Sequence, residues 1–253
     1  MIVMKFGGTS VESADAIERA ARIVGSRLKQ SPVVVVSAMA KVTDQLVAMG
    51  NAAAAGDCDS ALASLQNLRS RHLRTAGELL GAKRSASLAP RLEKHFSELE
   101  NFLRGLGAVR ELTPRGSDYV LSFGELLSSI MVADAFAVRG LSAAWVDSRE
   151  CLVTDAAHAR AVPQMDATRG RCKKKIVPLI SKRKVPVLGG FIAATESGVP
   201  TTLGRGGSDY SAAIFGATLD AEAIEIWTDV EGMMTTDPRI CPEARTIERI
   251  SFN

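Results

Sequence analysis

A run of four valines at residues 33–36 is the feature that most constrains the fold of this chain. The run is apolar at every position and follows Pro32, which is typical of a strand buried on both faces of a parallel sheet. A second short apolar run, residues 2–6, comes before it, and a helical pattern that extends to about Leu28 separates the two. Strand, helix and strand in this order predict a right-handed βαβ unit. The chain is therefore expected to adopt an α/β fold.

The remaining pattern extends this architecture. Residues 44–106 are rich in Ala, Leu, Arg and Glu, which predicts two or three helices broken near Gly56-Asp57 and again at residues 87–90. His72 and His95 lie in this segment, apart from any carboxylate or cysteine cluster, and are interpreted as surface or helix-packing residues. Further strands are predicted at residues 143–146, 185–188 and 223–227, and further helices after Glu125, around 173–182 and at 208–219.

Composition limits the classes of partner. The 253 residues are 46% hydrophobic and 23% charged, with a formal net charge of only +3, so nucleic-acid binding would need a localised basic patch. The best candidate patch comprises Arg169, Arg171, Lys173, Lys174, Lys175, Lys182, Arg183 and Lys184. No aromatic residue interleaves it and apolar residues follow at helical spacing, which favours a solvated helix face and no nucleic-acid partner.

Cysteines and apolar segments bear on the compartment. Cys58, Cys151, Cys172 and Cys241 lie far apart without a C-x-x-C pair, which argues against a zinc site and a disulfide framework. The N-terminus reaches Lys5 before an apolar core of a signal peptide develops, and no continuous apolar run approaches the length of a membrane span. The sequence favours a cytoplasmic protein without a membrane partner.

Two predicted strands end in residues suited to a polar ligand. Lys5 closes the first strand, and Gly7 and Gly8 follow it, where the carboxyl end of a parallel strand meets ligands in doubly wound sheets. The spacing is not that of a Walker A loop, and residues 9–12 match a capping box, so an ordinary strand-to-helix turn is the alternative. Ser37 and Thr43 follow the second strand, where their hydroxyls would hold a ligand or cap the next helix.

The densest glycine region lies further along the chain. Residues 189–209 contain six glycines in 21 positions, which indicates close approach to the backbone rather than packing. Within it, Arg205, Gly206, Gly207, Ser208 and Asp209 lead into a predicted helix. Unpaired amides at a helix start and an arginine fork together predict an anion site. The alternative is a glycine-rich turn with Ser208 as the helix cap.

Two further polar groups, Glu125 and the residues that follow the last predicted strand, are also candidates for ligand binding. Glu125 is the fourth residue of a Ser-Phe-Gly-Glu capping box, and its alternative role is that of a carboxylate for the amino group of a ligand. Thr228 and Asp229 close the last predicted strand, and Arg239 follows within twelve residues, an arrangement suited to a nucleotide and its metal. On local grounds the cap is favoured for Glu125.

Taken together, these segments resemble aspartate kinase, a branch of the amino-acid kinase family that phosphorylates the β-carboxylate of L-aspartate. The resemblance rests on five segments in the expected order: Lys5-Phe6-Gly7-Gly8-Thr9-Ser10-Val11, Ser37-Ala38 with Thr43, Gly190-Phe191-Ile192, residues 203–213, and residues 226–230 through Asp237-Pro238-Arg239. It covers the chain from its first residues to its last, and five segments in register are far more specific than any one of them.

The resemblance implies a three-layer α/β/α sandwich around a mainly parallel sheet, formed by a single domain over residues 1–253. Residues 1 to about 200 would form an aspartate-binding lobe, and residues 201–253 the start of an ATP-binding lobe. The reaction would use ATP and Mg²⁺ and give 4-phospho-L-aspartate, the first step toward lysine, threonine and methionine. L-aspartate and Mg-ATP would then be the partners of a cytoplasmic protein.

The resemblance also implies roles for individual residues. Lys5 would bridge the ATP phosphates, with Asp209 positioning it. Residues around aspartate would be Ser37, Thr43, Glu125, Phe191, Arg205, Gly206, Gly207 and Ser208, with Glu125 on the ammonium and Arg205 on the α-carboxylate. Nucleotide contacts would come from Gly7, Gly8, Thr228, Asp229, Met234 and Arg239. No protein metal site is implied.

The chain departs from the family pattern in two places. Met234 stands where the family usually has a tyrosine near the adenine, and a thioether still covers a base by dispersion, so altered affinity is expected. Family members also continue beyond the equivalent of Asn253 into a Gly-Ala-Lys segment and paired ACT domains that sense lysine or threonine. The expectation is therefore a kinase domain without ACT feedback, and an exposed apolar flank that favours a homo-oligomer. The alternatives are a catalytically impaired domain and a related kinase for another carboxylate, such as glutamate or acetylglutamate.

Overall fold

The computed structural model of the chain describes residues 1–204, 206–230, 232–238 and 240–251. Its main sheet has five parallel strands in the order β3-β5-β2-β1-β8. These strands are β1 (Ile2–Phe6), β2 (Pro32–Val36), β3 (Ala143–Trp145), β5 (Val185–Gly189) and β8 (Ala223–Trp227). A second, three-stranded sheet contains β4 (Val153–Thr154), β6 (Ile192–Thr195) and β7 (Pro200–Thr202), with β6 and β7 antiparallel. The predicted parallel sheet is confirmed.

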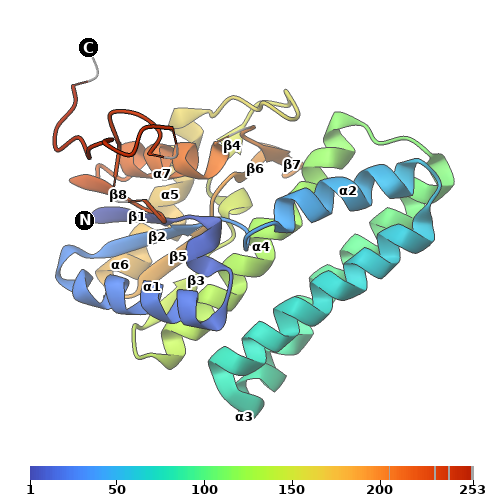
Figure 1. The fold of residues 1–253 in the computed structure, drawn as a ribbon, viewed down its shortest axis with the longest axis horizontal. Helices are drawn as coiled ribbons and strands as arrows, with labels where there is room; N and C mark the ends of the chain where they lie inside the picture. The colour runs from blue at the N-terminus through green and yellow to red at the C-terminus, as the bar shows by residue number, and fades with distance from the viewer. Residues whose placement is uncertain (205, 231, 239, 252–253) are drawn as a thin grey trace.

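Helices cover both faces of the main sheet (Figure 1). They are α1 (Ala14–Ser26), α2 (Val42–Ala54), α3 (Cys58–Val109), α4 (Pro114–Val138), α5 (Met165–Lys175), α6 (Val177–Ser181) and α7 (Gly207–Thr218). Three short 3₁₀ helices complete the described elements: η1 (Gly8–Val11), η2 (Leu28–Gln30) and η3 (Ser148–Glu150).

Successive side chains of β2 point to opposite faces of the sheet, and their packing partners show the three layers directly. Val34 and Val36 belong to a core shared with α1, α2, α3 and α4, whereas Val33 and Val35 belong to a second core shared with α5, α6 and α7. All four side chains are fully buried, as the continuous apolar run predicts. The α/β/α sandwich expected from the sequence is therefore the observed fold.

The helical segment after β2 differs from its predicted boundaries. The break at Gly56-Asp57 is confirmed, and the Asp57 side chain caps α3 by accepting from the Ser60 amide at 3.2 Å. The second break, predicted at residues 87–90, is wrong: α3 is two helical halves joined at Gly81, whose φ of 69° leaves the helical region, and Pro90 lies inside the second half. The two halves and α2 extend away from the sheet (Figure 1).

Two predicted capping boxes are wrong, because each helix begins elsewhere. Residues 8–11 form a 3₁₀ turn, and α1 begins after Ser13, whose hydroxyl accepts from the Ala16 amide at 3.3 Å. Helix α4 begins after Thr113, which accepts from the Gly116 amide at 3.1 Å, with Pro114 in its first turn. Ser122 therefore lies inside α4 and donates to the Tyr119 carbonyl instead.

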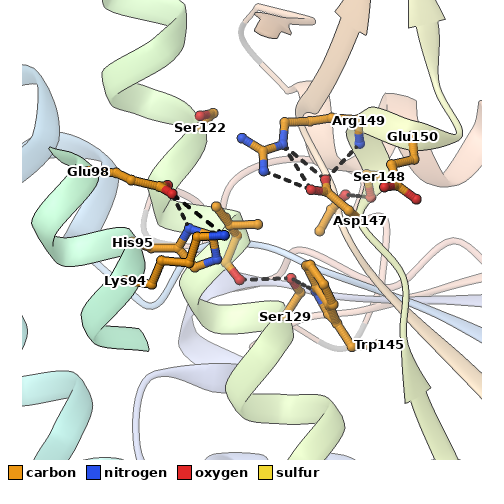
Figure 2. Close-up of polar contacts among 12 residues, drawn as sticks. Lys94, His95, Glu98, Ser122, Ser129, Trp145, Asp147, Ser148, Arg149 and Glu150 are labelled. Atoms are coloured by element: carbon orange, nitrogen blue, oxygen red, sulfur yellow. Dashed lines mark hydrogen bonds and ion pairs between the residues drawn. The ribbon is translucent and has the colours of Figure 1, made fainter. Parts of the chain in front are cut away.

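Helix α4 is the central helix of the domain. By length and composition it could cross a membrane, but 83% of its most apolar window is buried inside the protein, as in the core helix of a soluble domain. Trp145 on β3 donates its indole N–H to Ser129 of α4 at 3.0 Å, and Ser148 donates to the Gly189 carbonyl at 2.5 Å (Figure 2). The first bond holds α4 against the carboxyl end of β3, and the second joins η3 to the carboxyl end of β5.

Histidines and the basic run take largely structural positions. His72 is fully buried, donates its Nδ1–H to the Leu68 carbonyl at 2.9 Å, and burial lowers its pKa to about 4. His95 lies 3.0 Å from Glu98 on the same helix (Figure 2). Both histidines thus pack within α3, as expected. The predicted single helix at residues 173–182 is instead split into α5 and α6, and its lysines are exposed.

Strand β8 lies at one edge of the main sheet. Its Ile224 and Ile226 are 42% and 46% exposed, so this strand carries the expected apolar flank. Association of copies through that flank stays a prediction. Residues 228–251 after β8 contain one described bridge, between Met234 and Thr246.

Candidate active site

A cavity of about 520 Å³ opens where β1, β2 and β5 end beside α4 and α7. It collects most of the residues that the resemblance assigns to aspartate. Its predicted lining residues are Ser37, Thr43, Glu125, Phe191, Gly206, Gly207 and Ser208, and Gly8, expected at the nucleotide, lines it as well. Segments up to 200 residues apart in the sequence therefore meet at one site.

Close backbone approach explains the glycines of this site. A Cβ on Gly190 would lie 2.6 Å from the Ser208 Cβ, and a Cβ on Gly207 would lie 2.6 Å from the Phe191 ring. Real Cβ atoms do not approach so closely, so both positions need glycine to seat the first turn of α7 on the end of β5. The Ser211 hydroxyl also accepts from the Phe191 amide at 2.8 Å.

We expect Gly207→Ala to disrupt the packing of α7 on the end of β5. The added methyl collides with Phe191 and forces α7 or the ring to move, so unfolding free energy should fall by about 1–3 kcal/mol. Gly170→Ala is the matched control, because Gly170 is an exposed α5 residue with nothing within 4 Å of a new Cβ, and it should gain about 0.5–1 kcal/mol. Urea titration of both variants measures the difference. Equal stability in the two would contradict the close contact.

Ser208 is not the cap of α7. The cap position is Gly206, whose φ is 75°, and its carbonyl accepts the amides of Asp209 and Tyr210 at 3.1 and 3.2 Å. Ser208 lies in the first turn, and its hydroxyl accepts from the Ser37 hydroxyl at 2.9 Å. The hydroxyl of Ser208 is thus directed to the end of β2, where the cavity lies, because glycine has taken over the cap.

Lys5 and Asp209 form an ion pair beside the cavity. The distance between Lys5 Nζ and Asp209 Oδ1 is 2.6 Å, and the Lys5 side chain is 9% exposed while that of Asp209 is 57% exposed. Lys5 lies between β2 and β8, paired with Val35 and Ile226. The carboxyl end of β1 therefore holds a nearly buried ammonium whose partner still faces solvent.

Glu125 is the most unusual ionisable group in the site. Its side chain is 4% exposed, and its Oε2 has no hydrogen-bond partner within the described part of the protein. Burial raises the pKa of this carboxyl to about 8, although the Ala38 amide acts in the opposite direction. The local preference for Glu125 as a cap is wrong, because it lies in the middle of α4. A buried carboxyl on a cavity wall, with one oxygen that has no partner, is suited to receive a cation.

Sequence reasoning missed three polar residues of the cavity wall. Asp118 of α4, His158 and Thr202 form a hydrogen-bonded group, and Asp118 and Thr202 line the cavity. Asp118 precedes Glu125 by seven residues, or two helical turns, which places both on one face. A helix predicted to begin at Pro114 would have revealed this spacing.

Thr228 and Asp229 lie elsewhere. They line a separate cavity of about 400 Å³ with Phe6, Trp227 and residues of α1, on the sheet face opposite the Lys5–Asp209 pair. Thr228 and Asp229 thus do not line the cavity that contains Glu125, and Lys5 is a lining residue of neither cavity. Gly7 is hydrogen bonded to the Trp227 carbonyl at 3.1 Å and lies between the two sites. The nucleotide roles of these residues stay predictions.

The remaining predicted residues include two outside the described part of the chain, Arg205 and Arg239. Met234 is half-buried and bridges to Thr246 away from the cavity. Among the described residues, no group of three or more His, Cys, Asp or Glu side chains is placed to hold a metal ion. A divalent ion at this site would therefore be expected to arrive with a phosphate ligand.

A third cavity, of about 590 Å³, is lined by the basic side chains Arg149, Arg171, Lys174 and Lys175. Asp147 engages Arg149 at 2.7–3.2 Å, and Glu150 engages Lys175 at 2.6 Å; Figure 2 shows the first pair. Acids of the same cavity thus neutralise half of its cations. The cavity beside Glu125 remains the stronger candidate for a small anionic substrate.

Comparison with known proteins agrees with this geometry. The sequence profile of the amino acid kinase family matches residues 1–253. The chain belongs to that family. It is 36% identical over 252 residues to bifunctional aspartokinase/homoserine dehydrogenase 1 of Zea mays, and 35% identical over 255 residues to aspartokinase 2 of Arabidopsis thaliana, both chloroplastic. Each alignment covers 99% of this chain, but 27% and 46% of the respective relative.

Solved structures give the same result. Aspartokinase III of E. coli in complex with aspartate and ADP superposes with a TM-score of 0.88 at 32% identity, covering 98% of this chain and 53% of that one. Its lysine- and aspartate-bound T-state gives a TM-score of 0.87. The chain thus spans about a quarter to a half of the length of the aspartokinases it matches. The resemblance to aspartate kinase drawn from the five segments is confirmed.

Proposed function

We propose that this kinase-family domain transfers the γ-phosphoryl group of Mg-ATP to the β-carboxylate of L-aspartate, giving 4-phospho-L-aspartate. The E. coli neighbour binds aspartate and ADP, and the curated relatives are aspartokinases, which supports both substrates. The product would serve the synthesis of lysine, threonine and methionine. We also propose a cytoplasmic location and assign aspartate to residues 1 to about 200 and ATP to the segment from about residue 201.

The buried carboxyl of Glu125, whose Oε2 has no partner among the described residues, is the observation that carries this proposal. A substrate ammonium at Glu125 Oε2 would supply the missing partner and stabilise the ionised form. Ser37, Thr43 and the first turn of α7 offer hydroxyl and amide donors on the other walls of the cavity. A carboxylate oxygen of Glu125 that has no partner, facing several donors, matches an amino acid that carries one ammonium and two carboxylates.

Lys5 would neutralise the transferred phosphoryl group. Its ammonium lies at the carboxyl end of β1, and Asp209 on α7 fixes its position. Asp209 is over half exposed, so it retains solvation when the ammonium turns toward a phosphate. Lys5 therefore provides positive charge at the point where two anions have to meet, and electrostatic stabilisation of this kind is the main contribution that proteins make to phosphoryl transfer.

The reaction needs no general base from the protein. The β-carboxylate, with an ordinary pKa near 4, is already ionised at neutral pH. One of its oxygens attacks Pγ while the bond from Pγ to the β–γ bridging oxygen breaks, and ADP leaves with that electron pair. No proton moves in this step, which agrees with a cavity whose one described histidine contact, from His158, is to Asp118 rather than to a ligand position.

Titration calorimetry and acyl-phosphate trapping test the proposed function. The protein should bind Mg-ATP and L-aspartate, and hydroxylamine should trap aspartyl hydroxamate only when both are present. N-acetylglutamate lacks an ammonium for Glu125 and should give no hydroxamate, and glutamate should give much less than aspartate. Product from N-acetylglutamate but not from aspartate would refute the substrate assignment. Binding of both ligands without product would favour a catalytically impaired domain.

A further inference from the structure

Asp118 is a fully buried carboxylate on the wall of the aspartate cavity. Its Oδ2 accepts from His158 Nδ1 at 2.8 Å and from the Ala159 amide at 3.0 Å. Its Oδ1 accepts from the Thr202 hydroxyl at 2.5 Å and from the same amide at 3.1 Å. Both oxygens are therefore occupied by donors from two other segments of the chain.

Those segments are the loop at residues 155–163 and the end of β7. The loop is shaped by Asp155, whose side chain accepts from the amides of Ala157 and Val162 at 3.1 and 2.9 Å. It joins β7 through the Ala161 amide, which donates to the Thr202 carbonyl at 3.1 Å. Asp118 thus connects α4, the loop and β7 at one point, which we call the Asp118 clamp.

The Asp118 clamp also contacts the glycine-rich segment that follows β7. We call its described residues, 203–204 and 206–208, the substrate loop. Ala159 has a φ of 69°, which is unfavourable for a residue with a Cβ and persists only where surrounding contacts hold it. Its carbonyl lies 3.1 Å from the position that a Cβ on Gly204 would take. The strained loop thus rests directly on Gly204, two residues after Thr202 and two before Gly206, the cap of α7.

Asp118 and Glu125 differ in a way that separates their roles. They share one face of α4, two turns apart, and both line the cavity. Asp118 receives three donors, whereas Glu125 Oε2 receives none. A substrate cation therefore has a vacant acceptor at Glu125, while Asp118 is committed to the protein itself.

We propose that Asp118 is a positioning residue that holds the described residues of the substrate loop, 203–204 and 206–208, in their binding conformation through His158, Ala159 and Thr202. The proposal rests on the proposed function for its choice of ligand. A clamped loop has lost its conformational freedom before aspartate arrives, so binding does not have to order it. Without the clamp, the buried Thr202 hydroxyl and the partly buried Ala159 amide lose their acceptor, and the substrate loop is released.

Hydrogen exchange in the ligand-free protein tests the clamp without relying on turnover. In Asp118→Asn and His158→Ala, the amides of Ala159 and of residues 203, 204, 206 and 207 should exchange at least tenfold faster, while those of β1 and β2 remain unchanged. His95→Ala is the matched control, because that histidine contacts Glu98 on α3 and not the cavity. Unchanged exchange at Ala159 in both clamp variants would overturn the proposal.

Kinetics with conservative substitutions provide the second readout. Thr202→Val removes the donor to Asp118 and should raise KM for L-aspartate about tenfold, with kcat and KM for Mg-ATP within about twofold of the parent values. Thr202→Ser keeps the hydroxyl and should restore the parent KM. A loss confined to kcat, or a Thr202→Ser variant as impaired as Thr202→Val, would also overturn the clamp. Absence of aspartate binding in the parent protein would refute the proposed function, and the exchange result would still decide the clamp.

Discussion

Lys5→Ala is expected to lower the rate of phosphoryl transfer by about 10²- to 10³-fold while the fold remains intact. Removal of one well-placed electrostatic donor costs about 10²- to 10³-fold in enzymes that stabilise developing charge. Lys5 places its ammonium at the carboxyl end of β1, and its loss leaves the two anions to meet without that charge. Formation of aspartyl hydroxamate under saturating Mg-ATP and aspartate measures the effect.

The fold should tolerate this substitution. The partner of Lys5, Asp209, is 57% exposed, so water solvates its carboxylate when the ammonium is absent. Lys173→Ala serves as the matched control, since it removes a lysine from the exposed face of α5. Both variants should show the circular dichroism spectrum and cooperative melting of the parent. Unchanged turnover in Lys5→Ala would remove Lys5 from the mechanism, and loss of cooperative melting would show that its role is structural.

The sheet was predictable because the apolar pattern of its strands is visible in the sequence of each strand alone. Residues 33–36 are apolar at each position because both faces of β2 are covered by helices, so the pattern does not depend on which neighbours supply the cover. The glycines of the site were predictable for a similar reason. Gly190 and Gly207 mark positions where a side chain does not fit, and that requirement is local to the backbone.

The helix starts were less predictable, because sequences that match a capping box also occur at positions where no helix begins. Ser122 and Glu125 match a capping box, but Thr113 and Pro114 begin the helix eight residues earlier, and burial of α4 against the sheet carries it through both. Misplacing this start concealed Asp118, whose spacing from Glu125 has meaning only on a continuous helix. His158 gave no signal at all, since its partner is 40 residues away in the chain.

Glu125→Gln should weaken L-aspartate binding about 10- to 100-fold at pH 8, which is the second large effect expected at this site. The substitution keeps the shape of the side chain but removes the charge that would receive the substrate ammonium, and a hydrogen bond to a charged group in a buried site contributes about 1.5–3 kcal/mol. Titration calorimetry measures the loss. Glu111→Gln, at an exposed position outside the cavity, is the matched control and should bind as the parent does.

Protonation of Glu125 makes the same interaction depend on pH. Burial raises the pKa of its carboxyl to about 8 in the free protein, so the group is mostly protonated at pH 7. An ammonium beside it favours the ionised form and lowers its pKa, so aspartate binding should release a proton below pH 8. Affinity should therefore increase with pH by up to about tenfold per unit below pH 8 and level off above it.

The unfolding free energy should change in the opposite direction to the affinity: it should decrease as pH rises toward about 8. The pKa of this group in the folded protein, about 8, lies above its ordinary value of 4.5, so the unfolded chain loses the proton first as pH rises. The contribution of Glu125 to the unfolding free energy consequently declines between about pH 4.5 and pH 8, by an amount on the order of a few kcal/mol, and is constant outside that window. Glu125→Gln should abolish this decline.

Calorimetry in two buffers of different ionisation enthalpy separates the charge of Glu125 from its shape. At pH 6.5 the parent protein should release close to one proton per aspartate bound, whereas Glu125→Gln should release almost none, because its amide does not ionise. Proton release that is equal in the two proteins would show that another group titrates. No release from the parent would mean that Glu125 is already ionised before the substrate arrives, and the ammonium would then be bound by a preformed charge.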